Sequence, residues 1–93
     1  MYFSVVIPTY NRLPILEKCL RALEQQRIPS ETKIAGYEVV VVDDGSTDGT
    51  LGWLGDRVAE FPHVRTCEQA HQGPAAARNL GVREAKGDTI IFI

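Results

Sequence analysis

Four consecutive valines at residues 39–42 constrain the fold of this chain more than any other segment. Valine is β-branched and favours strands, and a run without polar alternation must have apolar groups on both of its faces. Strands of this kind occur in parallel sheets that carry helices on both sides. We therefore predict an α/β protein in which residues 37–42 form a buried strand.

Strands and helices alternate along the rest of the predicted order. The pattern predicts strands at residues 3–7, 37–42, 64–68 and 89–93, and helices at residues 13–27, 50–61 and 74–85. Residues 29–36 form a polar connection. This βαβαβαβ order predicts one domain, residues 1–93, with a three-layer α/β/α sandwich and a mostly parallel sheet.

Single residues mark several of the predicted boundaries. Pro8 is expected to stop the first strand, and Asn11 is a candidate cap for the helix that follows. Gly52 and Gly55 weaken the second helix. Pro74 suits the first turn of the third helix, where its missing N–H costs nothing.

The composition excludes several classes of protein. A formal net charge of −2 gives no overall attraction to a polyanion, so a nucleic-acid partner is not expected. No signal peptide is visible, and no apolar run approaches the roughly 20 residues that span a bilayer. We expect a cytoplasmic chain with no transmembrane segment, and any attachment to the cytoplasmic membrane face would come from other regions.

The cysteines and histidines do not suggest a metal site. Cys19 and Cys67 are too far apart for a paired zinc motif, and Cys19 shares the helical spacing of apolar core residues. His63 and His71 each lack a second ligand at metal spacing. We expect both histidines to be solvated and no metal to be bound by this chain.

Three common loop motifs are absent or incomplete. The first strand-to-helix turn has no glycine, which excludes the dinucleotide fingerprint, and no phosphate-binding P-loop occurs. Asp44, Ser46, Asp48 and Gly49 imitate the start of a calcium loop, but the position that needs a bidentate glutamate is Gly55. Redox cofactors, P-loop chemistry and calcium are therefore set aside.

Residues that could contact a ligand follow the first two strands. Pro8, Thr9 and Tyr10 follow the first strand, and Asp43 and Asp44 follow the second. Ligands of open α/β sheets bind beyond the carboxyl ends of the strands. An aromatic ring packs on a nucleobase while a carboxylate accepts a base N–H, so the two loops predict a nucleoside site.

Simpler interpretations exist for the same residues. Tyr10 could only cover the start of a helix, and Asp43 and Asp44 could belong to a turn that caps one. Two acids directly after an all-valine strand exceed what capping needs. Arg78 follows the small residues 75–77. Its guanidinium suits either a phosphate or an ion pair with Asp43 or Asp44, and both alternatives stay open.

Four motifs together give the chain a family resemblance. In order, they are VVIPTYNR at residues 5–12, VVDDGSTDGT at 41–50, GPAAARNLG at 73–81 and AKGD at 85–88. The chain resembles the N-terminal part of a family 2 glycosyltransferase. The resemblance implies the GT-A fold, whose nucleotide-binding half is Rossmann-like, with strand order 3-2-1-4 and the sheet cut after its fourth strand.

The resemblance also assigns roles. It implies a nucleotide-binding site composed of Pro8, Thr9, Tyr10, Asp43, Asp44 and Arg78. Asp44 would hydrogen-bond the base, Asp43 would support the loop, and Arg78 would lie near the base or phosphate. His71, Gln72 and Gly73 stand where many relatives have Asn-x-Gly, and this departure leaves contacts from the loop to the nucleotide open.

The implied reaction transfers a sugar from a nucleoside-diphosphate sugar, UDP-sugar being the commonest, to an acceptor hydroxyl. The family uses a divalent cation, Mn²⁺ or Mg²⁺, on the diphosphate and an acidic residue as general base. The resemblance places both the cation ligands and the catalytic residues beyond Ile93. This chain would then hold the nucleoside-binding part and be inactive alone.

Two other functions fit the same motifs less fully. One is a non-enzymatic module that binds nucleotide sugars or assists assembly. The other is a receiver-like domain with Asp43 and Asp44 as an acidic pocket. If the fourth strand lies beside the first, as the GT-A order implies, residues 90–93 form an apolar edge. We then expect self-association into a homo-oligomer through that edge or through uncovered helix faces.

Overall fold

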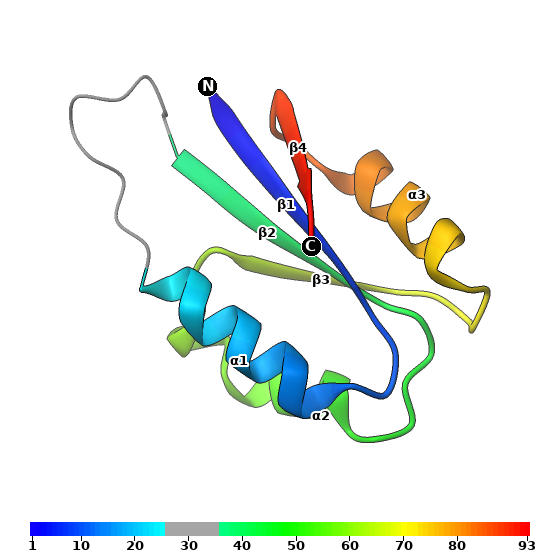
Figure 1. The fold of residues 1–93 in the computed structure, drawn as a ribbon. Coiled ribbons are helices and arrows are strands. Elements are labelled where there is room, and N and C mark those ends of the chain that lie inside the picture. The colour runs from blue at the N-terminus through cyan, green and yellow to red at the C-terminus, as the bar shows by residue number, and fades with distance from the viewer. Residues whose placement is uncertain (26–35) are drawn as a thin grey trace.

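The structure is a computed structural model that describes residues 1–25 and 36–93. Strands and helices alternate along it (Figure 1). In chain order they are β1 (Tyr2–Thr9), α1 (Leu13–Glu24), β2 (Gly36–Asp43), α2 (Thr50–Asp56), the 3₁₀ turn η1 (Val58–Glu60), β3 (Val64–Glu68), α3 (Pro74–Glu84) and β4 (Thr89–Phe92). The predicted connection at residues 29–36, apart from Gly36, lies outside the described residues. α1 ends at Glu24 with Gln25 as its C-cap, before the predicted end near Arg27.

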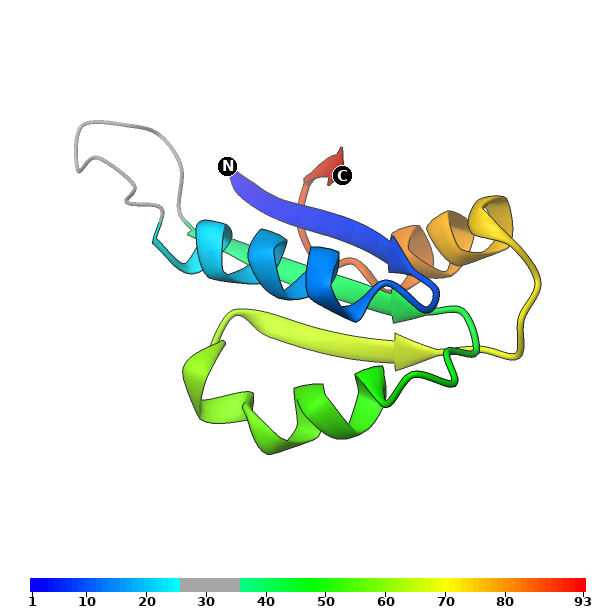
Figure 2. The ribbon, with the colours of Figure 1, turned by 60° about the horizontal axis from the view of Figure 1, so that its bottom comes forward.

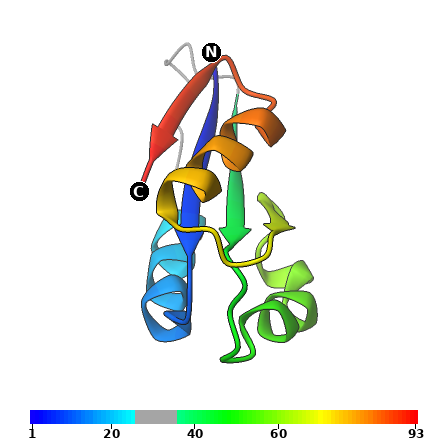
Figure 3. The same ribbon diagram turned by 90° about the vertical axis from the view of Figure 1, so that its right-hand side faces the viewer.

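All four strands form one parallel sheet in the order β3-β2-β1-β4, which confirms the expected order. The register places Val5 beside Val39 and Val6 beside Val40. Since the strands are parallel, the carboxyl ends of β1 and β2 meet at one edge of the sheet. The loop from β3 to α3 also starts there, as Figure 3 shows.

Helices cover both faces of the sheet, with α1 and α2 on one side and α3 on the other (Figures 1 and 2). Alternate strand residues therefore enter two cores. The first contains Val5, Ile7, Val39 and Val41 with Leu16, Leu20, Leu54 and Phe61. The second contains Val6, Val40 and Val42 with Ala77. The valine run is buried on both faces, and the three-layer α/β/α prediction is confirmed.

The first strand does not stop at Pro8, as predicted, but continues to Thr9. The carbonyl of Val6 accepts a hydrogen bond from the Ile93 N–H, so even-numbered residues of β1 direct their backbone groups toward β4. Pro8 is paired with Val42 of β2. Because its nitrogen faces away from β2, its missing N–H costs no hydrogen bond between β1 and β2.

The second helix is shorter than predicted. α2 ends at Asp56, where the sequence pattern continued to Phe61. Arg57 has φ −121°, which is outside the helical range, and the 3₁₀ turn η1 follows. This break carries the ring of Phe61 into the first core, where it is buried. Glycines within α2 lower the cost of stopping there.

A polar cluster ties the strands together at the opposite edge of the sheet, near their amino ends. The buried Glu38 carboxylate accepts hydrogen bonds from the Ser4 hydroxyl and the Lys86 N–H, both at 2.6 Å, and from Arg65 Nε at 3.0 Å. Burial opposes ionisation, but these donors hold the pKa of Glu38 below its usual value. The Gly87 N–H donates to the Ser4 hydroxyl at 2.8 Å. The cluster therefore fixes where β4 begins.

Small residues let α3 lie close to the sheet, as the sequence suggested. Ala77 is fully buried, and Gly81 faces Val6 and Val42. A Cβ atom at Gly81 would overlap Val6 Cγ1 and lie 3.3 Å from Val42 Cγ2. These neighbours belong to the packed second core and have little room to move.

We predict that Gly81→Ala destabilises the fold by about 1–3 kcal/mol, because the added methyl group overpacks the core. Gly52→Ala is the matched control, since Gly52 also lies in a helix but has no atom near its missing Cβ. This control should stabilise by about 0.5–1 kcal/mol through helix propensity. Urea unfolding of both variants measures the difference. Equal free energies of unfolding would show that α3 does not pack as described.

We also predict that the chain self-associates through β4. Among the described residues the outer edge of β4 has no strand partner, and Ile91, Phe92 and Ile93 are exposed. Phe92→Lys should shift the chain toward monomer in light scattering over a concentration series, because a charge on an edge strand opposes pairing. Val58→Lys, at an exposed site on η1, is the control. A wild-type monomer at high concentration would contradict the prediction.

Candidate functional site

A pocket of about 420 Å³ lies at the carboxyl ends of β1 and β2. Its volume is within the range of roughly 300–1,000 Å³ that is typical of small-molecule sites. It is lined by Pro8, Thr9, Tyr10, Arg12, Asp44, His71, Pro74, Ala77, Arg78 and Ile93. All of the predicted nucleotide-binding residues except Asp43 are thus brought together around one cavity.

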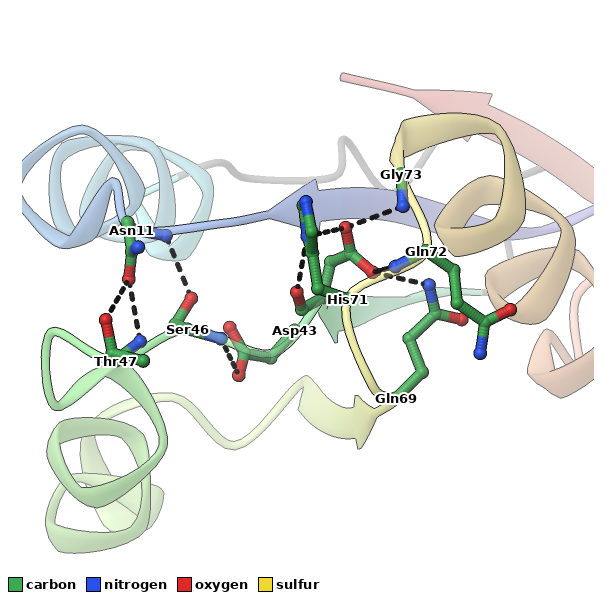
Figure 4. Close-up of polar contacts among 9 residues, drawn as sticks. Asn11, Asp43, Ser46, Thr47, Gln69, His71, Gln72 and Gly73 are labelled. Carbon is green, nitrogen blue, oxygen red and sulfur yellow. Dashed lines mark hydrogen bonds and ion pairs between the residues drawn. The ribbon is translucent and has the colours of Figure 1, made fainter.

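The Asp44 carboxylate lies at the wall of this pocket, and both of its oxygens accept hydrogen bonds. The residues around it, Gln69, His71, Gln72 and Gly73, are labelled in Figure 4. Its Oδ1 accepts from Gln69 Nε2 at 2.7 Å and from the Gln72 N–H at 2.8 Å. Its Oδ2 accepts from the Gly73 N–H at 3.0 Å and lies 2.9 Å from His71 Nδ1. A carboxylate has about four lone-pair positions. Three of them accept hydrogen bonds from Gln69, Gln72 and Gly73, and the His71 ring faces the fourth.

These donors set the ionisation of Asp44. The Gln69 amide and the backbone N–H groups of Gln72 and Gly73 lower the pKa of the carboxyl from 3.8 to about 2, although burial opposes them. Only 3% of the residue is exposed. Asp44 is therefore a fixed negative charge that holds the loop between β3 and α3 against the end of β2.

His71 was expected to be solvated, and its side chain is indeed 57% exposed, but it also makes specific contacts. Its ring stacks on Tyr10 with centroids 4.1 Å apart and an interplanar angle of 26°. Its Nδ1 is also 3.2 Å from the Asp44 backbone oxygen. Gly45 permits this approach, because its φ is +82° and a Cβ there would lie 2.9 Å from the His71 backbone nitrogen.

Asn11 was expected to cap α1, and this expectation is wrong. Its side-chain oxygen accepts from the Thr47 N–H at 2.7 Å, and its own N–H donates to Ser46 Oγ at 2.9 Å (Figure 4). The first N–H of α1, on Leu13, donates instead to Asp48 Oδ2 at 3.2 Å. The loops after β1 and β2 are thereby joined, and Asn11 adopts a φ of +48° to make the junction.

Asp43 and Arg78 complete the set of predicted residues. Asp43 is fully buried, and its Oδ2 accepts from the Ser46 N–H at 3.2 Å, so it supports the loop. Its Oδ1 has no hydrogen-bond partner among the described residues. Arg78 is exposed on the pocket wall and, within the described residues, makes no ion pair with Asp43 or Asp44. The ion-pair alternative for Arg78 is therefore wrong.

Cys19 and Cys67 are half-buried free thiols, and burial raises the pKa of both. Residues 1–25 and 36–93 contain no group of three or more His, Cys, Asp or Glu side chains that could hold a metal ion. In the same residues no helix has the length and apolar character to cross a membrane.

The pKa of Asp44 predicts how stability depends on pH. Between pH 4 and pH 2 the unfolded carboxyl takes up a proton before the folded one, so the stabilisation is complete above pH 4 and is lost as the pH falls toward 2. Asp44→Asn should remove this component and also lower stability at neutral pH, because its NH₂ group would face other donors. Urea unfolding of both proteins across this range isolates the effect. A stability difference that does not change with pH would contradict it.

Comparison with known proteins agrees with this architecture. The family model described as "Glycosyl transferase family 2" matches residues 4–93. The uncharacterized glycosyltransferase YfnE of Bacillus subtilis is 41% identical over 99% of this chain and 22% of its own length. A poly(ribitol-phosphate) beta-glucosyltransferase of Bacillus spizizenii is 37% identical over 100% of this chain and 14% of its own length. The chain therefore spans only a small part of these relatives.

Two solved structures extend the similarity to three dimensions. S. aureus TarS in complex with UDP aligns with a TM-score of 0.81 and 33% identity, covering 100% of this chain and 27% of that one. The mannosyltransferase PcManGT from Pyrobaculum calidifontis, in complex with GDP-Man and Mn²⁺, aligns with a TM-score of 0.79 and 33% identity over 95% of this chain and 25% of its own. With its parallel α/β sheet and this match over residues 4–93, the chain belongs to glycosyl transferase family 2 and has the GT-A fold.

Proposed function

We propose that this chain supplies the nucleoside-binding part of an enzyme that transfers a sugar from a nucleoside-diphosphate sugar, first of all a UDP-sugar, to an acceptor hydroxyl. One observation carries the proposal. An aromatic ring, a fixed carboxylate and an exposed guanidinium line one pocket at the carboxyl ends of β1 and β2; they belong to Tyr10, Asp44 and Arg78. This is where ligands of open α/β sheets bind.

Each group suits one part of a nucleoside diphosphate. The Tyr10 ring offers an apolar face for a base, and Asp44 offers its Oδ2, which the His71 ring contacts in this structure, as an acceptor for a base N–H. Arg78 carries positive charge for phosphate. The amino end of α3, at Pro74, borders the same pocket, and its partial positive charge favours an anion. Base and diphosphate would thus lie along one continuous wall.

The solved neighbours support a nucleotide ligand. TarS was solved with UDP, and PcManGT was solved with GDP-Man. Both have the fold of this chain at 33% identity. The choice between uridine and guanosine, the sugar and the acceptor are part of the proposal and await measurement.

The divalent cation does not fit the described residues of this chain. They offer no group of three His, Cys, Asp or Glu ligands, and the oxygens of Asp44 are held by N–H donors that a cation would have to displace. PcManGT was solved with Mn²⁺, which supports a cation in the family. We propose that the cation ligands and the general base belong to the part of the relatives that this chain does not span, and that the chain alone transfers no sugar. A cytoplasmic location stays a prediction.

We predict that the chain binds UDP and that Tyr10→Ala weakens binding about 5- to 150-fold, since base stacking on an aromatic ring contributes about 1–3 kcal/mol. Tyr2→Ala is the matched control, because Tyr2 begins β1, far from the pocket, and is 37% exposed against 40% for Tyr10. Calorimetric titration with UDP, GDP and dTDP measures affinity and ranks the bases. Equal losses in both tyrosine variants would refute the assignment of Tyr10.

A further inference from the structure

We infer that His71 is a specificity-determining placeholder: its ring occupies the face of Tyr10 and the oxygen of Asp44 that a nucleobase would use, so a nucleoside binds by displacing it. The inference rests on the proposed function. Removing a side chain that lines a binding pocket ordinarily weakens ligand binding. For His71 we expect the opposite: its removal should strengthen nucleoside binding.

The first step follows from the saturation of Asp44. Its oxygens already accept from Gln69, Gln72 and Gly73 and contact His71. A base N–H can therefore reach the carboxylate only by replacing one of these donors. Two of them are backbone N–H groups of the loop that leads into α3, and they cannot leave without moving the helix.

The second step identifies which side chain leaves. Gln69 is half-buried, and its own N–H donates to the Asp43 carbonyl at 3.0 Å, which holds it in the ladder beside β2. The His71 side chain is 57% exposed and can swing toward solvent. It is also the one donor that stacks on Tyr10. Displacing His71 alone therefore frees both groups that a base needs.

The third step concerns the chemistry of the imidazole. Nδ1 lies near two acceptors, Oδ2 and the backbone oxygen of Asp44, so it carries a proton in either the neutral or the charged ring. A flat ring that stacks on Tyr10 and directs an N–H at Asp44 presents the same pair of groups as a base with an imino N–H. Uracil, thymine and guanine have such a group and can restore the lost hydrogen bond. Cytosine and adenine lack this ring N–H and can offer the carboxylate only an exocyclic amino group, which lies at a different position on the base.

The chain contains its own control for this experiment. His63 stacks on Tyr37 with centroids 4.4 Å apart and pairs with Glu24 at 3.2 Å, so it repeats the tyrosine and carboxylate contacts of His71. It does not line the pocket. Replacing either histidine removes a stacked ring and one carboxylate contact, but only His71→Ala opens the pocket.

The test is the affinity of UDP and CDP for the wild-type chain, His71→Ala and His63→Ala. We expect His71→Ala to bind UDP about 3- to 20-fold more tightly, because the wild-type pocket is open for only a fraction of the time. His63→Ala should match the wild type, and CDP should bind the wild type more weakly than UDP. In NMR spectra of the wild type, UDP should shift the ring signals of His71 and leave those of His63 unchanged.

The outcomes separate the two proposals. Weaker or unchanged UDP binding by His71→Ala, with Tyr10→Ala still losing affinity, overturns the placeholder and leaves the proposed function intact. Unshifted His71 signals at saturating UDP overturn it as well. If none of the variants binds any nucleotide at millimolar concentration, including His71→Ala, both the placeholder and the proposed function are wrong.

Discussion

The hydrogen bonding of one carboxylate, that of Asp44, determines how the site is assembled. The residue directly follows the buried valine strand, and its N–H donates to the Thr9 carbonyl at 2.9 Å, which aligns the ends of β1 and β2. Its side chain then collects the backbone N–H groups of Gln72 and Gly73 at the start of α3. Burying a charge is costly unless donors surround it, so the loop is held for the same reason that the carboxylate is tolerated. Without this charge, the loop before α3 would lose the acceptor that holds it against the end of β2.

The fold was largely predictable because its signals are local. The valine run predicted a strand that is covered on both faces, and the small residues of α3 indicated a helix close to the sheet. The order of the strands followed from the family resemblance and is confirmed. Several predicted boundaries differ from the structure, and two of these differences have non-local reasons. Pro8 continues β1 because it pairs with Val42 while its nitrogen faces away from β2, and α2 stops early so that Phe61 reaches the core.

The site was predicted only in part, because its connections join residues far apart in the sequence. The carboxyl ends of parallel strands must meet, and this rule placed Tyr10 and Asp44 correctly in one pocket. It does not say which groups bond to which. His71 is 27 residues from Asp44, and Asn11 is 36 residues from Thr47. The one hint in the sequence was Gly45, whose need for a positive φ indicates that another segment approaches it closely.

The two ends of the sheet are secured by different side chains. Ser4, Glu38 and Arg65 fasten the strands at one edge, and none of them takes part in the hydrogen bonds around Asp44 at the other. Evolution can therefore exchange pocket side chains such as His71 and Gln69 while the register of the strands is maintained elsewhere. When the side chains that hold the strands are separate from those that line the pocket, a few substitutions can change the ligand preference without first producing a variant that fails to fold. The separation of these two edges is thus a source of adaptability as well as of stability.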